Sequence, residues 1–351
     1  MVEDFISSLR QEMEWMKSSA HEFDTIYIGG GTPSCLREDS LQKIFSGVYE
    51  VFGNDLQQNT EITMEANPAD ISSKALTHWK TLGVNRISLG AQSFDDNTLV
   101  FLGRRHNRKT ALCALDLTVH GGFQHVSCDL LLGLPHTSAK ENTPKIIAKA
   151  RKEQEIAINT GIDHLSLYIL TASGSTPLAR MVQNGAVFLP KEDLSAHQLL
   201  QSSLFLKSHG FHHYEVSNFA REVTAESRHN MKYWTGLPYL GFGPGAHSFD
   251  GSGHRWWNIP KIDKYIESIS RGDMPPRKEE FLTDNQRRTE KLMLGLRTSR
   301  GVSRDLADAG GTYDGLIKEL IRQGFLFASD DMLIPTEKGM LTADAIASKL
   351  C

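Results

Sequence analysis

The chain has 351 residues, of which 40% are hydrophobic and 23% charged, and its net charge is -4. This composition is that of an ordinary globular protein, and the slightly negative charge gives no reason to expect nucleic acid as the main partner. No apolar stretch reaches the roughly 18 residues that a membrane span needs. The acidic start, Met1-Val-Glu-Asp, is unlike a basic targeting segment.

Short apolar runs alternate with longer amphipathic stretches in the first half of the chain, as in strand–helix units. Predicted strands cover residues 24–28, 61–64, 85–89, 126–132 and 164–170. Predicted helices cover residues 2–18, 38–52, 70–82, 108–120 and 141–159. Helical crossovers imply parallel strands, and we expect each strand to be apolar and covered on both faces. The expected fold is α/β, a full or partial (β/α) barrel.

Polar residues or glycines follow these strands directly. Gly29-Gly30-Gly31-Thr32 offers free N–H groups and lets a ligand approach the backbone, although it matches neither a Walker loop nor a dinucleotide fingerprint. Because the carboxyl ends of parallel strands meet at one edge, we expect these groups to converge. The side chains of this set are those of Glu65, Gln92, Arg104, Arg105 and Asp129. Together these groups suit a zwitterionic ligand that also carries hydroxyls.

Each member of this set has a structural alternative. Asp129 could cap a turn, Gln92 could bind backbone groups, and Arg104 could be a surface charge. Five such groups at strand ends nevertheless favour a shared ligand site.

The second half begins with a predicted helix over residues 191–209 and a predicted strand over residues 211–216. Residues 217–258 follow, a long stretch rich in glycine and aromatic residues that we expect to be an irregular functional loop. An apolar wall with histidines suits a planar macrocycle whose iron takes a histidine ligand. The alternative is that the aromatic rings form core and that His229 bonds to a loop backbone.

A smaller domain is predicted from residue 276, after the pair Pro275-Pro276. Predicted helices cover residues 283–297, 302–309, 313–323 and 337–349, with a hairpin at 324–335. This order is typical of a winged-helix module. Its balanced charge favours docking to the barrel or a protein over nucleic acid. The expected domains are thus 1–275, which includes the aromatic and glycine-rich segment at 217–258, and 276–351.

Several motifs together resemble the radical S-adenosylmethionine barrel of the oxygen-independent coproporphyrinogen III oxidase family. They are Gly29-Gly-Gly-Thr-Pro-Ser34, Glu65-Ala-Asn-Pro68, Asn85-Arg-Ile-Ser-Leu-Gly-Ala-Gln-Ser-Phe94, Leu102-Gly-Arg-Arg-His106 and Asp129-Leu-Leu-Leu-Gly-Leu-Pro135. Three later blocks resemble its HemW subfamily of heme chaperones: Tyr214-Glu-Val-Ser-Asn-Phe-Ala220, His229-Asn-Met-Lys-Tyr-Trp234 and Tyr239-Leu-Gly-Phe-Gly-Pro-Gly-Ala-His-Ser248. The resemblance covers nearly the whole chain.

The resemblance implies two sets of binding residues. The S-adenosylmethionine contacts would be Gly30, Gly31, Thr32, Glu65, Gln92, Arg104, Asp129 and, as a weaker match, Thr171. The heme site would contain His229 as the favoured iron ligand, with Asn230, Tyr233 and Trp234 beside it. Asn230 could orient the imidazole, while His247 and His254 are weaker ligand candidates.

The family also carries Cys-x-x-x-Cys-x-x-Cys after its first strand, where three thiolates hold a [4Fe–4S] cluster. The cysteines of this chain are Cys35, Cys113, Cys128 and Cys351, and no two have a metal-site spacing. We therefore expect a partial barrel without that first strand, in which residues 24–28 form an edge, and no radical catalysis from this chain.

Three function classes stay open. The first is a heme chaperone that delivers heme to a recipient protein, the second a radical S-adenosylmethionine oxidase of a porphyrinogen, and the third a non-catalytic truncated isoform. The subfamily blocks favour the first. By resemblance the location is mitochondrial or cytoplasmic. We expect no nucleic-acid partner and no membrane span, and dimerisation stays open.

Overall fold

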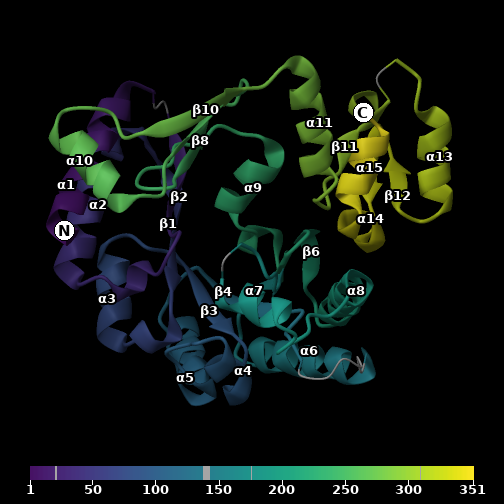
Figure 1. Cartoon of the computed structure of the whole chain (residues 1–351), viewed down its shortest axis with the longest axis horizontal. Helices are drawn as coiled ribbons and strands as arrows, with labels where there is room; N and C mark the ends of the chain where they lie inside the picture. Colours follow the sequence, from purple (N-terminus) through teal and green to yellow (C-terminus); the bar gives the residue numbers. More distant parts are fainter. Residues whose placement is uncertain (20–21, 137–142, 175, 309) are drawn as a thin grey trace.

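The structure, a computed structural model, describes every residue except 20–21, 137–142, 175 and 309. Its centre is a curled seven-stranded sheet in the order β1-β2-β3-β4-β5-β7-β6 (Figure 1). The strands are β1 (Phe23–Ile28), β2 (Leu56–Ala66), β3 (Arg86–Gln92), β4 (His125–Leu132), β5 (His164–Ile169), β6 (His212–Glu215) and β7 (Asn218–Ala220). The prediction of an α/β partial barrel is confirmed.

Strands β1 to β5 are parallel, as predicted, and β7 and β6 close the far side as an antiparallel hairpin. β1 lies at the end of the sheet order, so it is an edge strand, also as predicted.

The prediction of strands that are apolar on both faces is wrong. Alternate residues of β2 differ sharply: Ile62 and Met64 belong to the hydrophobic core, whereas Glu61 and Thr63 are buried polar residues. The same alternation runs through the neighbouring strands, because successive side chains of a strand point to opposite faces. One face of the sheet therefore packs against helices, and the other is lined by polar side chains.

The helices of the first half are α1 (Val2–Met16), α2 (Glu38–Phe52), α3 (Ser73–Thr81), α4 (Asp96–Phe101), α5 (Arg108–Val119), α6 (Thr143–Ile158), α7 (Pro177–Gln183) and α8 (Glu192–Ser208). Figure 1 shows α3, α5, α6 and α8 along one side of the sheet. The prediction omitted α4 and α7. Residues 141–142, at the start of the predicted helix 141–159, lie outside the described residues.

The segment 217–258 is not an irregular loop. It contains β7, α9 (Arg228–Thr235), β8 (His247–Phe249) and β9 (His254–Asn258). β8 and β9 form a second, antiparallel sheet with β10 (Arg277–Phe281), and α10 (Ile262–Ser270) lies between β9 and β10 in the chain. These short elements were not predicted, because glycine and aromatic residues recur at short intervals in this segment and interrupt any periodic hydrophobic pattern.

The last part of the chain has its own hydrophobic cluster, which includes Leu292, Ile317, Leu333 and Ile346. Its elements are α11 (Asp284–Gly295), β11 (Val302–Ser303), α12 (Arg304–Ala307), α13 (Asp314–Arg322), β12 (Leu326–Ser329), β13 (Met332–Pro335), α14 (Glu337–Leu341) and α15 (Ala343–Lys349). The predicted helix 337–349 is thus two helices, and residue 309 of the predicted helix 302–309 lies outside the described residues.

The domain boundary at residues 275/276 stays a prediction. The strand β10, which follows this boundary, pairs with β9, which precedes it. In the described part of the chain, no helix combines the length and the apolar character needed to cross a membrane.

Candidate functional site

Two carboxylates stand on the polar face of the sheet and share a neighbour. Glu65 on β2 lies opposite Ser88 on β3 in the strand register. The hydroxyl of Ser88 donates to the carboxylate of Asp129 on β4, at 2.9 and 3.1 Å. The two carboxylates predicted from sequence to converge therefore lie on adjacent parts of one surface.

The carboxyl of Asp129 has a raised pKa. Burial raises its pKa to about 6, and the negative charge of Glu65 adds to this, while hydroxyls of Ser166, Ser88 and Ser127 act in the opposite direction. At neutral pH the carboxyl is ionised, because this pKa lies about one unit below pH 7. A cationic group placed beside the buried negative charge would be bound favourably.

The glycine turn that follows β1 closes over Glu65. The Gly30 N–H donates to Glu65 Oε2 at 3.1 Å, and Gly30 has a φ of +83°, which favours glycine. A Cβ on Gly29 would lie 2.4 Å from the Tyr27 ring and 2.7 Å from the Glu65 carboxyl carbon. The turn can approach the carboxylate this closely only because no side chain intervenes.

The remaining residues of the first predicted set lie around this surface less tightly. Gln92 ends β3 with a φ of +67°, where the β3–β4 register shifts. Arg104 is an exposed residue overall, although partial burial of its guanidinium group lowers its pKa. Arg105 instead forms an ion pair with Asp70 at 2.8 Å. Gly31, Thr32 and Thr171 are exposed, and the described contacts do not join Arg104 or Thr171 to the carboxylates.

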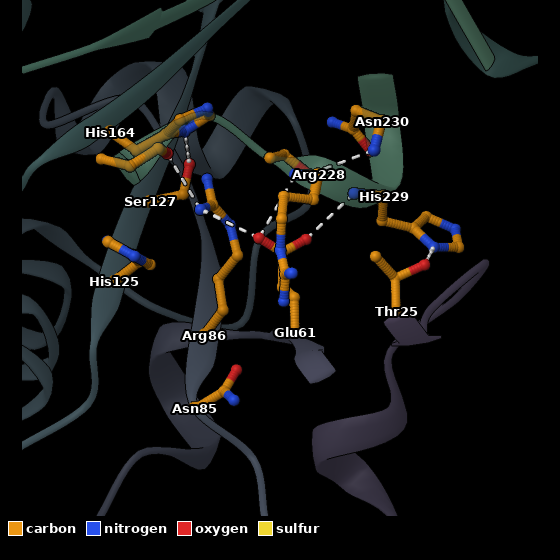
Figure 2. Close-up of polar contacts among 12 residues, drawn as sticks. Thr25, Glu61, Asn85, Arg86, His125, Ser127, His164, Arg228, His229 and Asn230 are labelled. Carbon is orange, nitrogen blue, oxygen red and sulfur yellow. Dashed lines mark hydrogen bonds and ion pairs between the residues drawn. The ribbon is translucent and has the colours of Figure 1, made fainter. Parts of the chain in front are cut away.

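The predicted heme residues lie on a helix, which corrects the expectation that His229 is in a loop. The Ser227 hydroxyl caps the first turn of α9, and Gly236 in a left-handed conformation ends it. Figure 2 shows Glu61 of β2 beneath this first turn. Its carboxylate accepts hydrogen bonds from the N–H groups of Arg228 and His229, at 3.3 and 3.0 Å. The helix is thereby fixed to the polar face of the sheet.

The imidazole of His229 is enclosed by three side chains. Nδ1 lies 3.0 Å from the Thr25 hydroxyl (Figure 2), and Nε2 lies 2.8 Å from the Tyr233 hydroxyl. The Tyr27 ring stacks on it with centroids 4.8 Å apart. Burial lowers the pKa of His229 to about 4, and the charge of Lys232 contributes to this. The ring is therefore neutral at pH 7, the form in which histidine binds metals.

Asn230 and Trp234 occupy a different face of α9 from His229 and Tyr233, since residues four apart share a helix face. Trp234 packs against the cluster that contains Tyr214 and Met231. The suggestion that Asn230 orients the imidazole is not matched by the described hydrogen bonds, in which Thr25 and Tyr233 take that part.

A cavity of about 960 Å³ runs along the free edge of β1. Its walls are mainly apolar and come from α1, α2, β1 and the stretch 239–247. His229, Tyr233, His247 and the whole turn Gly29–Thr32 line it, whereas Asn230, Trp234 and His254 do not. The cavity is thus bordered by part of each predicted binding set, the glycine turn from one and His229 and Tyr233 from the other, while Glu65 and Asp129 are not among its lining residues. His254 instead contacts Glu279 at 3.0 Å.

Three residues of this site were absent from the sequence prediction: Thr25, Tyr27 and Glu61. Tyr27 is the link between the sets, because its hydroxyl donates to Glu65 Oε1 at 2.8 Å while its ring stacks on His229. A charged residue such as Glu61 inside an apolar strand was a usable signal, since buried charges are paired in folded proteins. Thr25 and Tyr27 gave no comparable signal.

No group of three or more His, Cys, Asp or Glu that could hold a metal ion occurs among the described residues. The thiol nearest in sequence to the glycine turn, Cys35, is exposed and free. The residues described here therefore do not fit a [4Fe–4S] cluster, which is normally held by three or four thiolates.

Comparisons with known proteins agree with this architecture. Residues 4–143 match the family model of the radical SAM superfamily. The chain is 33% identical to "Heme chaperone HemW" of Bacillus subtilis (strain 168), over 98% of this chain and 90% of that protein. It is 32% identical to "Radical S-adenosyl methionine domain-containing protein 1, mitochondrial" of Bos taurus, over 95% of this chain and 76% of that protein.

Among solved structures, the fold is similar to that of coproporphyrinogen III oxidase (HemN) from Escherichia coli, described as a radical SAM enzyme. The TM-score is 0.79, with 99% of this chain and 83% of that chain covered. Because the two sequences are only 20% identical, this likeness concerns the fold alone.

Proposed function

Because the chain belongs to the HemW family of the radical SAM superfamily, we propose that it binds heme and delivers it to a recipient protein. The carrying observation is the neutral imidazole of His229 at the wall of a large, mainly apolar cavity. Burial of a porphyrin there would remove a large apolar surface from water, and the imidazole would bind the iron directionally.

Within this proposal the four predicted heme residues have different tasks. His229 is the iron ligand, and Tyr233 is a wall of the heme cavity that both residues line. Asn230 and Trp234 support α9 from its other face, where Trp234 packs on the cluster with Met231. His247 also lines the cavity and is a weaker candidate for the ligand.

We also propose that the glycine turn and the polar sheet face form an S-adenosylmethionine site. Its contacts would be Gly30, Gly31, Thr32, Glu65, Gln92, Arg104, Asp129 and Thr171. The fit is chemical: carboxylates suit an amino group and ribose hydroxyls, an arginine suits a carboxylate, and the turn accepts a close ligand. Since the described residues do not fit an iron–sulfur cluster, we assign them no radical step. We propose a mitochondrial or cytoplasmic location, of which the first is the one printed in the name of the Bos taurus relative.

Heme titration of the wild-type chain and of His229→Ala, followed by absorbance, tests the proposal. We expect wild type to give a saturable Soret band, and His229→Ala to shift this band and bind more weakly. His247→Ala, at an exposed position in the same cavity, is the matched control and should change much less. Circular dichroism and thermal unfolding confirm that each variant is folded. An unchanged spectrum for folded His229→Ala would refute the ligand assignment.

A further inference from the structure

Both nitrogens of the His229 ring contact side-chain hydroxyls, and these two hydroxyls differ in how firmly the structure holds them. Nδ1 meets the Thr25 hydroxyl and Nε2 meets the Tyr233 hydroxyl, at 3.0 and 2.8 Å. A metal can use a ring nitrogen only through its free lone pair, so one of these partners has to leave before iron can bind. The question is which of the two can leave at lower cost.

Thr25 is fixed in place. Its relative exposure is 8%, and it lies in β1, where its backbone pairs in register with Glu61 of β2. The same Glu61 accepts the backbone N–H of His229 at 3.0 Å. The strand β1, the Glu61 carboxylate and the first turn of α9 are thus linked to one another on the Nδ1 side of the ring. The Tyr27 ring, stacked at 4.8 Å, fixes the plane of the imidazole.

Tyr233 is in a more open position. Its relative exposure is 40%, and its ring borders the cavity. It meets His229 and Tyr239 edge-on, with centroids 5.3 and 4.7 Å apart. Its hydroxyl lies at the end of a rotatable side chain, so its hydrogen bond to His229 can be replaced by a hydrogen bond to water. The Nε2 partner is therefore the one that can be displaced.

From these contacts we propose that the Tyr233 hydroxyl is a displaceable latch on Nε2, and that Thr25 is the positioning residue that keeps Nδ1 fixed while heme iron replaces the latch. This inference rests on the proposed heme function. In the step, the O–H···Nε2 hydrogen bond breaks and the Nε2 lone pair forms the bond to iron. The Nδ1 proton stays on nitrogen and remains donated to Thr25, so no proton is released. A fixed Nδ1–H donor of this kind is the usual support of a metal-bound histidine.

The proposed latch predicts that two conservative variants change heme affinity in opposite directions. Tyr233→Phe keeps the ring and removes the competing hydroxyl, so heme affinity should rise, by about 2- to 10-fold if one ordinary hydrogen bond is lost. Thr25→Val keeps the shape and removes the Nδ1 partner, so affinity should fall by a similar factor and the spectrum of the ferric heme should change. Thr25→Ser keeps the hydroxyl and should restore both.

A merely structural role would give a different result, because both hydroxyl deletions would then weaken binding together with stability. Heme titrations of the three variants, with urea unfolding in parallel, separate the cases. Unchanged or weaker binding by folded Tyr233→Phe overturns the latch. If wild type binds no heme, or binds equally well after His229→Ala, the proposed function itself has failed.

A heme-free measurement keeps the latch testable in every case. Nitrogen-15 NMR of the His229 imidazole reports which ring nitrogen carries the proton. We expect the proton on Nδ1 and an Nε2 signal that moves in Tyr233→Phe but not in Tyr239→Phe, the control one ring farther away. A proton found on Nε2 overturns the proposed arrangement.

Discussion

The carboxylate of Glu61 on β2 accepts a hydrogen bond from the backbone N–H of His229, a residue 168 positions later in the chain. Glu61 is itself paired with Arg86, whose Nη1 lies 3.6 Å away, and both side chains are at most 5% exposed. Arg86 also donates to the carbonyl oxygen of Ala225 at 2.9 Å, just before α9. The candidate heme ligand is thus held by a buried ion pair inside the curled sheet (Figure 2).

This pair predicts strong coupling between its two members. Removal of one partner leaves a buried charge unpaired, which costs about 3–5 kcal/mol. We expect Glu61→Gln and Arg86→Met each to lower the free energy of unfolding by such an amount, and the double variant to lose much less than the sum. Urea unfolding in a double-mutant cycle measures this. Strictly additive losses would show that the pair is not coupled.

Asp129 predicts a pH-dependent stability difference. Its pKa of about 6 in the fold lies above the value near 3.9 of an unfolded aspartate. A carboxyl with a raised pKa binds protons more readily when folded, so its cost to stability is absent below pH 4, grows between pH 4 and 6, and is complete above pH 6. Asp129→Asn removes this cost, by an amount on the order of 3 kcal/mol.

Urea unfolding at pH 4, 5, 6 and 7 tests this expectation. The stability of Asp129→Asn relative to wild type should increase through that range and then level off. Asp39→Asn, at an exposed position in the first turn of α2, is the control. A difference for Asp129→Asn that does not change with pH would mean that the carboxyl is not perturbed by burial.

The proposed S-adenosylmethionine site predicts weak binding that depends on two carboxylates. Glu65→Ala and Asp129→Ala each remove a charged hydrogen-bond acceptor, which is worth about 1.5–3 kcal/mol. Calorimetric titration of the chain with S-adenosylmethionine should therefore show weak binding that each substitution reduces by about 10- to 100-fold.

The control for that titration is Glu38→Ala, which removes an exposed carboxylate at the start of α2. It should leave binding as in wild type. Tight binding that neither Glu65→Ala nor Asp129→Ala alters would place the ligand elsewhere.

The cysteines predict the outcome of metal reconstitution. Cys128 is buried, the other three are exposed, and all four are free. Anaerobic incubation of this chain with iron and sulfide should give no stoichiometric [4Fe–4S] signal in absorbance or paramagnetic resonance. About four irons per chain with a reducible cluster would contradict the prediction, unless the site is shown to lie between two chains.

The parallel strands, most of their helices and the motifs at the strand ends could be predicted from the amino-acid sequence alone. These features are local, since hydrophobic period and glycine turns act over a few residues. The convergence of Glu65 and Asp129 followed from the same reasoning, because strand ends in a parallel sheet share one edge. The edge position of residues 24–28 was instead an implication of the family resemblance.

The surroundings of His229 could not be predicted, because they are formed by contacts that exist only in the folded chain. Its helix was not predicted, because it is only eight residues long within a stretch rich in glycine and aromatic residues. So short a helix depends on packing and on its contact with Glu61. Thr25, Tyr27 and Tyr233 meet its ring from a strand 204 residues away and from the next helical turn. Contacts between such distant residues depend on how the sheet curls, which no local pattern in the sequence encodes.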